Sequence, residues 1–262
     1  MYLEGSLLAD YLLIGVLVLV VASFVAGFLD SVAGGAGLIL VPAFILTGMP
    51  PQLALGQEKL VSTLGTISAI YNFFKNGKII WKVVGYGIPT ALIGAYIGGE
   101  VILAIDESIV GKIIFFMIPI GLVLSFMPKK DKKDGLYEPT KKDIMFVLPI
   151  VALVIGFYDG FFGPGTGSML ILALHFLVHM PLIESSATSK IFNFASNTGA
   201  FIAFAIAGKM AFIIGIPMIL ASIVGNYIGS HMTLKNGDKI IKPLIFTSIA
   251  ILFISLGIKY IW

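Results

Sequence analysis

Long apolar stretches follow one another along almost the whole chain, separated by short polar or glycine-rich breaks. Several of them approach or exceed the roughly 20 apolar residues that a helix needs to cross a bilayer, which predicts membrane-spanning helices. Two stretches are much shorter, and each directly follows a glycine cluster. The apolar segments cover residues 7–29, 38–47, 60–74, 83–105, 113–127, 144–162, 169–178, 191–207, 210–228 and 243–258.

The composition strengthens this prediction. The chain is 58% hydrophobic and 12% charged, with a mean hydropathy of +1.03, which is too apolar for a soluble globular protein. Backbone polar groups must be hydrogen-bonded inside lipid, so the spanning elements should be helices, and any unwound glycine stretch should be buried or line a cavity. We therefore expect an all-α, multi-pass protein of the cell membrane with about eight to ten membrane segments.

The second half of the chain repeats features of the first. Gly-Phe-Leu-Asp at 27–30 corresponds to Gly-Phe-Tyr-Asp at 156–159, and Lys59 corresponds to Lys190. A glycine cluster follows each aspartate. Such a duplication, with helix breaks at matching places, is typical of secondary transporters built from two structural repeats. We predict a first transmembrane repeat at 1–128, a cytoplasmic lysine-rich linker at 129–143 and a second transmembrane repeat at 144–262.

Lysines predict the orientation in the membrane, because cytoplasmic loops carry an excess of basic residues. All seventeen basic residues are lysines, and six of them lie in the linker. If each half crosses the membrane five times, the halves are inverted, and the lysine-rich turns at 75–82 and 235–242 lie inside with the linker. If the short segments do not cross, the halves are parallel and the second of these turns falls outside. The positive-inside rule favours inverted repeats, with re-entrant short segments as the alternative.

The glycine-rich breaks are candidate binding elements. Glycine allows left-handed backbone and close approach of other groups. A helix that begins after such a break presents free N–H groups and the positive end of its dipole, which suits an anion. Close helix packing through small residues is the alternative; the matched position of both clusters favours a binding role. The candidates are Gly34, Gly35, Gly37, Gly163, Gly165, Thr166 and Gly167.

Lys59 and Lys190 stand at the start of apolar helices at equivalent positions of the two halves. A lysine deep in a bilayer costs on the order of 3 kcal/mol or more unless it is paired or hydrated. Polar residues recur around each lysine at helical spacing. We predict two facing halves of an anion site near the membrane midplane, with lysines that extend to the interface as the alternative. The polar candidates are Ser62, Thr63 and Thr66 in the first half and Ser189, Asn193 and Asn197 in the second.

Asp30 and Asp159 precede the two breaks. Each carboxylate can serve as a proton or sodium site, as the counter-ion of the equivalent lysine, or as a helix cap. Counter-ion or cap is favoured, and desolvation of either one would allow proton coupling. Glu58 is not paired with Lys59 in this interpretation, because adjacent residues of a helix do not face each other.

Other chemistry has little support in the sequence. His175 and His179 lie four residues apart, but no H-E-x-x-H motif accompanies them, so an interfacial pair at a helix end is favoured over a metal site. The chain contains no cysteine and no nucleotide-binding or hydrolase motif. We therefore predict no metal, no cofactor, no nucleic-acid partner and no enzymatic activity.

Two segments carry a family resemblance. They read Gly-Phe-Leu-Asp-Ser-Val-Ala-Gly-Gly-Ala-Gly at 27–37 and Gly-Phe-Tyr-Asp-Gly-Phe-Phe-Gly-Pro-Gly-Thr-Gly at 156–167. Together with Ala-Thr-Ser-Lys at 187–190, they resemble the sulfite exporter TauE/SafE family of membrane transporters, from about Gly15 to Gly257. The resemblance implies transport of small anions, often sulfur-containing ones such as sulfite or sulfonates.

Two positions depart from that family's pattern. Ala36 interrupts what is commonly a longer glycine run, and Gln57-Glu58 stands where a small Thr-Asn or Thr-Ser pair is usual before the lysine. A carboxylate at position 58 would oppose an anion unless it is protonated or turned away.

The leading hypothesis is a secondary transporter of a small anion, a sulfur oxyanion or organosulfonate, by alternating access around a midplane site between the repeats. Its partners would be the anionic substrate, the lipid bilayer, and a coupling proton or sodium bound at Asp30 or Asp159. One alternative is a cation- or proton-conducting transporter or channel that uses the two aspartates. Another is an integral membrane enzyme acting on a lipid or isoprenoid phosphate, which the absence of arginine disfavours.

Overall fold

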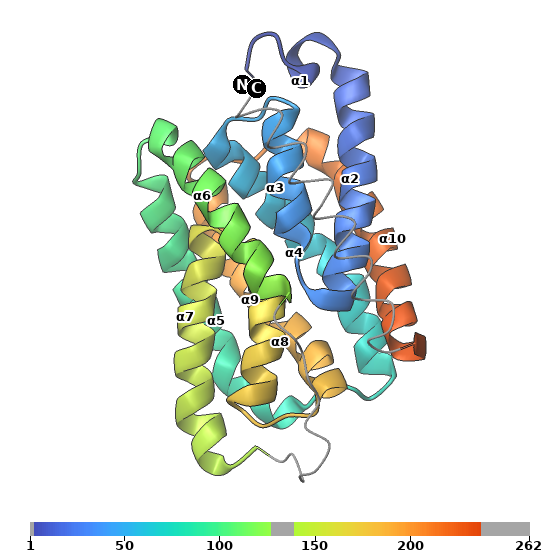
Figure 1. Ribbon diagram of the computed structural model, residues 1–262, viewed down its shortest axis with the longest axis vertical. Helices are drawn as coiled ribbons and strands as arrows, with labels where there is room; N and C mark the ends of the chain where they lie inside the picture. The colour runs from blue at the N-terminus through green and yellow to red at the C-terminus, as the bar shows by residue number, and fades with distance from the viewer. Residues whose placement is uncertain (1–2, 127–138, 237–262) are drawn as a thin grey trace.

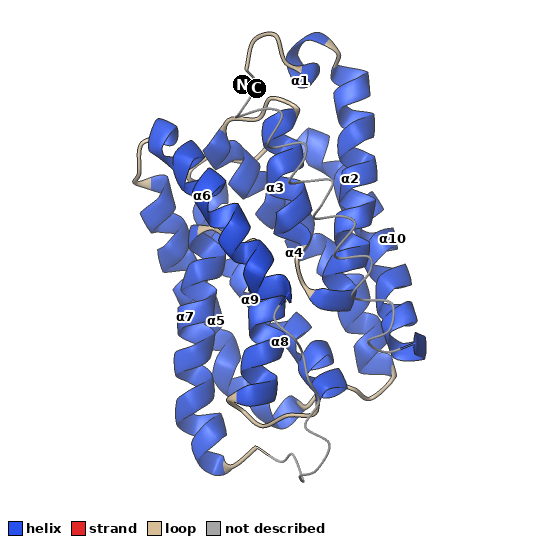
Figure 2. Cartoon of the chain, in the orientation of Figure 1, coloured by secondary structure: helices blue, strands red, loops and turns tan. Residues whose placement is uncertain are grey.

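In the computed structural model the described residues, 3–126 and 139–236, form helices joined by short connections, and none of them forms a strand (Figure 2). The predicted all-α class is confirmed. Most of the predicted linker and the apolar segment at 243–258 lie outside the described residues. The elements are α1 (Leu7–Asp10), α2 (Leu12–Ala33), α3 (Ala36–Leu46), α4 (Pro51–Lys75), α5 (Trp81–Leu103), α6 (Glu107–Phe126), the π-helical turn η1 (Asp143–Val147), α7 (Leu148–Phe161), α8 (Thr166–Phe176), α9 (Leu182–Ile206) and α10 (Phe212–Asn236).

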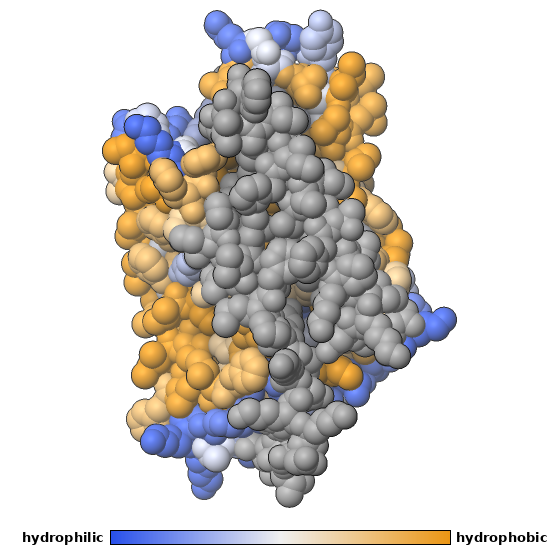
Figure 3. All heavy atoms as spheres, in the orientation of Figure 1, coloured by the Kyte–Doolittle hydropathy of each residue, from blue (hydrophilic) through white to orange (hydrophobic). Residues whose placement is uncertain are grey.

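The surface of the bundle is that of a membrane protein. Within the described residues, four helical stretches are long and apolar enough to span a bilayer: Leu12–Ala33, Trp81–Leu103, Asp143–Phe161 and Phe212–Lys235. Large apolar side chains on these helices point outward; Ile213, for example, is 86% exposed. In Figure 3 hydrophobic residues cover the visible flanks, whereas hydrophilic residues gather at the two ends. This distribution fits a bundle whose sides face lipid and whose ends face water.

Helices of the two halves match in length. The short helices α3 and α8 both have 11 residues, and the polar helices α4 and α9 both have 25. A proline stands directly before α9 and at the start of α4, where its fixed φ and missing N–H fit the first helical turn. These equal lengths agree with the duplicated sequence pattern.

Packing joins the two halves crosswise. Helix α5 packs on α7 and α9, and its counterpart α10 packs on α2 and α4. Glycines at matching positions allow close approach: a Cβ on Gly94 would lie 2.2 Å from the carbonyl oxygen of Leu153, and one on Gly225 would lie 2.1 Å from that of Phe24. Small residues let membrane helices meet backbone on backbone in this way. Each half therefore packs one of its helices against the other half.

The direction of the chain differs between the halves. In Figure 1 α2 begins at the top of the view, and α7 begins at the bottom. Opposite directions are what inverted repeats require, although the inversion of the complete halves stays a prediction. The short helices α3 and α8 measure only about 16 Å at the usual rise per residue, about half of a hydrocarbon core.

Candidate functional site

Glycines with positive φ form the two predicted breaks, after α2 and between α7 and α8. Gly34 follows α2 with φ 73°, and Gly163 and Gly165 follow α7 with φ 94° and 90°. Only glycine adopts such angles without strain. The two breaks touch: a Cβ on Gly34 would lie 2.3 Å from the carbonyl carbon of Gly167. The Ser168 hydroxyl also links the two breaks, because it donates to the carbonyl oxygen of Gly34 across 2.9 Å.

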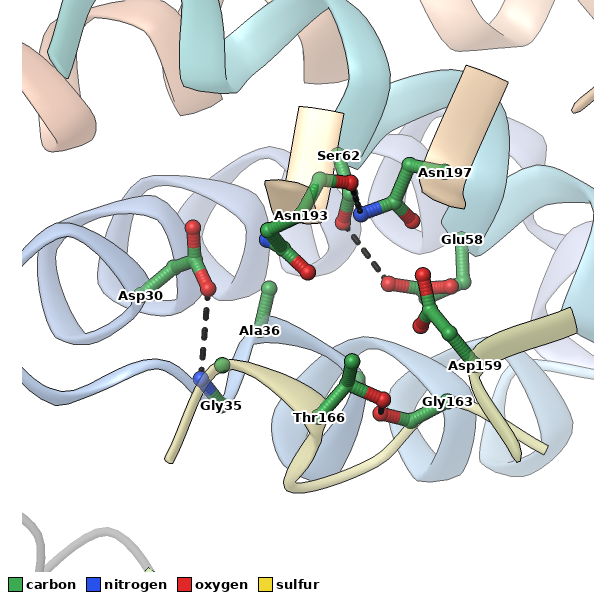
Figure 4. Close-up of a pocket in the computed structure, with 12 residues that line it drawn as sticks. Asp30, Gly35, Ala36, Glu58, Ser62, Asp159, Gly163, Thr166, Asn193 and Asn197 are labelled. Carbon is green, nitrogen blue, oxygen red and sulfur yellow. Dashed lines mark hydrogen bonds between the residues drawn. The ribbon is translucent and has the colours of Figure 1, made fainter. Parts of the chain in front are cut away.

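The starts of α3 and α8 and the polar faces of α4 and α9 surround a small polar cavity. It lies where the two glycine breaks meet, and residues of both halves contribute to its wall (Figure 4). Neither short helix has a side-chain cap at its N-terminus. The N–H of Thr166, the first of α8, already donates to the Gly163 carbonyl oxygen across 3.0 Å. The lining residues are Asp30, Gly35, Ala36, Gly37, Glu58, Ser62, Asp159, Gly163, Thr166, Gly167, Asn193 and Asn197.

Lys59 of α4 is buried against the second half of the chain. Its ammonium nitrogen donates to Oδ1 of Asp159 on α7 across 2.8 Å and lies 2.9 Å from Oε2 of Glu58. A Cβ on Gly163 would lie 2.5 Å from the same nitrogen, so the missing side chain makes room for the ammonium group. The expectation that Glu58 and Lys59 do not pair is wrong. Adjacent backbone positions diverge, but both side chains are long enough to bend toward each other.

Lys190 of α9 forms the corresponding contact with the first half. Its ammonium nitrogen donates to the main-chain carbonyl of Asp30 and lies 3.3 Å from Oδ2 of the same residue. The other carboxylate oxygen of Asp30 accepts a hydrogen bond from the Gly35 N–H across 3.2 Å. Each lysine thus pairs with the aspartate of the opposite half. Neither lysine extends to an interface, since Lys59 is 1% exposed and Lys190 is fully buried.

Two of the predicted polar residues point into the cavity with unused hydrogen-bonding capacity. The Asn197 amide nitrogen donates to the Asn193 carbonyl oxygen across 2.8 Å. Its Oδ1 is buried and has no hydrogen-bond partner among the described residues. The Asn193 side chain lies beside it on the same wall (Figure 4). These amides are available to a ligand.

Three other candidates lie away from the cavity wall. Thr63 donates to the carbonyl oxygen of Lys59 across 2.6 Å, and Ser189 donates to that of Ser186 across 2.8 Å. Both hydroxyls therefore bond to their own helix. Thr66 lies deeper and makes a long contact of 3.4 Å with Oδ2 of Asp30.

Two residues outside the candidate set take part in the site. Ser196 donates to Oδ2 of Asp159 across 2.5 Å, and Glu58 lies in the cavity wall with Oε1 bonded to the Ser62 hydroxyl across 2.7 Å. Both lie in the polar stretches that mark α4 and α9 in the sequence. Glu58 is one residue before Lys59 and Ser196 is six residues after Lys190, so neither has the helical spacing that selected most of the other candidates. Their polar character within these stretches is the signal that points to them.

The site holds more carboxylates than ammonium groups. In the described part of the chain, three buried carboxylates line the cavity, and two buried lysines stand behind its wall. With every group ionised, the formal charge is −1. The excess belongs to the first half, where Lys59 has two acidic neighbours; Lys190 has one.

The two histidines lie apart from this site. His175 is buried, with Nδ1 2.8 Å from the Met180 carbonyl oxygen. His179 is exposed, with Nδ1 3.5 Å from Oδ2 of Asp143. Within 3–126 and 139–236, no three histidine or acidic side chains gather as a metal site would require.

The sequence pattern of the family described as Sulfite exporter TauE/SafE matches residues 19–256. This chain belongs to the TauE/SafE family. The resemblance carried by the two glycine-rich segments is therefore confirmed. Membership in TauE/SafE, with the apolar spanning helices, makes the chain a membrane transport protein.

Bacterial relatives of this TauE/SafE chain are each described as a probable membrane transporter protein. A "Probable membrane transporter protein" of Haemophilus influenzae is 36% identical, over 87% of this chain and 89% of that protein. "Probable membrane transporter protein ORF9" of Sinorhizobium sp is 37% identical, over 89% of both chains. "Probable membrane transporter protein YfcA" of Escherichia coli K12 is 34% identical, over 89% of this chain and 86% of that protein. No solved structure matches the chain.

Proposed function

We propose that this protein is a secondary transporter of a small anion, with a sulfur oxyanion or an organosulfonate as its substrate class. The observation that carries the proposal is the pair of buried lysines, Lys59 and Lys190, each ion-paired across the repeats beside one shared cavity. The family description, Sulfite exporter TauE/SafE, supports the substrate class.

The energetics of buried ion pairs support a functional role for the lysines. Taking two charges out of water costs several kcal/mol each, and an apolar pair of similar volume is often as stable or more stable. Two such pairs at equivalent positions therefore contribute little to stability compared with apolar side chains. They do keep two positive charges inside the membrane, each neutralised by a carboxylate that an anionic substrate could replace.

The crossed pairing also supports alternating access. Because Lys59 contacts Asp159 and Lys190 contacts Asp30, a rocking motion of one half against the other must lengthen or exchange these contacts. In the proposed cycle a substrate anion takes the place of one or both aspartates. N–H groups in the first turns of α3 and α8 and the amides of Asn193 and Asn197 then donate to its oxygen atoms.

A cation is the second candidate substrate. Three carboxylates surround the cavity, and the buried Oδ1 of Asn197 has no partner among the described residues. Oxygen ligands of this kind suit sodium or a proton. In that case the lysines would serve only to neutralise part of the negative charge.

Flux into proteoliposomes separates these candidates. The purified protein is reconstituted, and uptake of labelled sulfite and of a panel of small sulfonates is measured with and without a pH or sodium gradient. Saturable uptake of a panel member is expected. Lys59→Gln and Lys190→Gln should reduce it strongly, and Lys78→Gln, a half-exposed lysine 3.6 Å from Glu184, serves as the matched control. Sodium or proton flux without uptake of any panel member would favour the cation alternative.

A further inference from the structure

The two halves of the site differ at one charged position. The residue before Lys59 is Glu58, and the residue before the equivalent Lys190 is Ser189. Ser189 bonds to its own helix through the Ser186 carbonyl oxygen. The third carboxylate of the cavity wall therefore has no acidic counterpart in the second half.

Glu58 is the acidic group with the weakest compensation. It is 3% exposed, and Oε1 contacts the Ser62 hydroxyl at 2.7 Å. Oε2 lies 2.9 Å from the ammonium nitrogen of Lys59, but the geometry is not that of a hydrogen bond, and this oxygen has no hydrogen-bond partner among the described residues. Lys59 instead donates to Asp159 at 2.8 Å. Asp159 receives a second hydrogen bond, from Ser196.

No other cation in the described part of the cavity offsets the charge of Glu58. From its own helix it faces Lys59 and Ser62, from α7 it faces Asp159, and across the cavity on α2 lies Asp30, which is already bound to Lys190 of α9. The first turns of α3 and α8 contribute only uncharged residues to the wall, and the facing positions of α9 are asparagines. Tyr158, next to Asp159, donates its hydroxyl hydrogen to the Pro164 carbonyl oxygen.

A buried charge that is incompletely compensated is expensive, and proteins avoid this cost by neutralising such a group. Two carboxylates that share one ammonium group face the same difficulty, because like charges at short range disfavour the doubly ionised state. The geometry of the Lys59 cluster thus calls for one proton. Asp159, with a hydrogen bond to each oxygen, is satisfied as an anion; Glu58 is not.

We propose that Glu58 is the site that binds the coupling proton, and that the second half of the cavity binds none. The coupling role rests on the proposed transport function, whereas the proton site itself does not depend on it. When the proton binds to the Glu58 carboxylate, the formal charge of the cavity changes from −1 to 0, so an anion is no longer repelled. When the proton leaves, the carboxylate competes with the substrate for Lys59 and favours its release.

Infrared spectroscopy tests the proton site without any substrate. A protonated carboxylic acid has a carbonyl stretch that a carboxylate lacks, and exposed carboxylates are ionised at neutral pH. We expect the purified protein in lipid to show this band at neutral pH and to lose it on alkaline titration. Glu58→Gln and Glu58→Ser should abolish the band, and Glu184→Gln, which removes a partly exposed carboxylate near Lys78, should retain it.

Two results of that experiment would overturn the proposal. One is the absence of the band from the unmodified protein, a measurement that depends on no variant. The other is persistence of the band in Glu58→Gln, which would assign the proton to Asp30 or Asp159. Glu58→Asp keeps a titratable carboxyl group at this position and is expected to keep the band.

Proteoliposome flux tests the coupling. With the membrane potential held at zero, one proton per substrate predicts an accumulation of about tenfold per unit of pH gradient. Methanesulfonate is the first probe, because it does not titrate near neutral pH, and labelled sulfite is the second. Glu58→Gln should lose the response to the gradient and retain exchange of internal for external substrate. A full response in Glu58→Gln would overturn the coupling role, whereas a failure of both probes in the unmodified protein would count against the substrate class and leave the infrared result to decide the proton site.

Discussion

The two ion pairs between the halves look equivalent, but the lysines have different numbers of acidic neighbours. Lys190 has Asp30 as its single acidic partner and is held by both the main-chain carbonyl and the carboxylate of that residue. Lys59 has two acidic neighbours, Asp159 and Glu58. The second lysine is therefore balanced in charge, and the first lies in a cluster with one negative charge too many. The duplicated scaffold pairs a lysine with an aspartate in both clusters, and one cluster carries an additional titratable group.

The largest expected effect comes from removing the aspartates one at a time. Asp30→Asn leaves Lys190 buried without a counter-ion, which typically costs about 3–5 kcal/mol. Asp159→Asn leaves Glu58 beside Lys59, so we expect a clearly smaller loss. Thermal unfolding in the same detergent compares the two variants directly.

A double variant provides the control for that prediction. Asp30→Asn combined with Lys190→Met removes both charges and should recover much of the stability, because replacing a complete buried pair is often neutral. Equal losses in the two single variants would contradict the difference between the clusters.

The glycines beside the two clusters should also differ. Gly34→Ala and Gly163→Ala both place a side chain at a left-handed φ, at a cost of about 1–2 kcal/mol. The new methyl of Gly34→Ala would in addition strike the Gly167 backbone, which cannot move aside, whereas that of Gly163→Ala meets the flexible end of Lys59. We expect the first variant to be the less stable in thermal unfolding and the second to lose more transport than stability.

Gly208→Ala isolates the backbone cost in that experiment. Its φ is 67°, and a Cβ there would meet no atom within 4 Å. It should therefore show the left-handed penalty alone and transport normally. If Gly163→Ala behaved like Gly208→Ala in both measurements, close approach of the Lys59 ammonium group would not matter for transport.

The sequence predicted the class of fold well and the ends of the polar helices poorly. The apolar segments at 60–74 and 191–207 correspond to α4 (Pro51–Lys75) and α9 (Leu182–Ile206), which begin nine residues earlier. The early part of each helix carries buried polar side chains, such as Gln52 and Gln57 of α4 and Thr188 of α9, that bond to residues outside their own helix. A search for apolar stretches misses such turns, because the polar face is matched by protein partners that lie far away in the sequence.

The charged residues of the site were predicted from the sequence, but which lysine pairs with which aspartate was not. Lys59, Lys190 and the aspartates could be recognised because each half carries the same residues at the same places. Which aspartate meets which lysine depends on how α4 lies against α7 and α9 against α2, and the sequence of either half holds no information about that arrangement. Likewise, Thr63 lies one turn after Lys59 and Ser189 directly precedes Lys190, but both hydroxyls bond to the preceding turn of their own helix.

The smallest expected effects concern hydroxyl groups that support the aspartates. Ser196 donates to Asp159 across 2.5 Å, and Thr66 reaches Asp30 only across 3.4 Å. Hydrogen bonds to charged groups contribute about 1.5–3 kcal/mol, and long ones contribute much less. Ser196→Ala should therefore lower the thermal unfolding temperature more than Thr66→Val does. The reverse order would indicate that Asp30, not Asp159, depends on its hydroxyl partner.

The most direct test of a shared transport site is uptake by the double variant Asp30→Asn with Lys190→Met, reconstituted beside the unmodified protein. Removing the complete pair should leave the fold intact, so transport can be measured without the cost of an unpaired charge. If the pair forms half of the anion site, saturable uptake of sulfite or a small sulfonate should be lost in the folded variant. Saturable uptake equal to that of the unmodified protein would contradict this account.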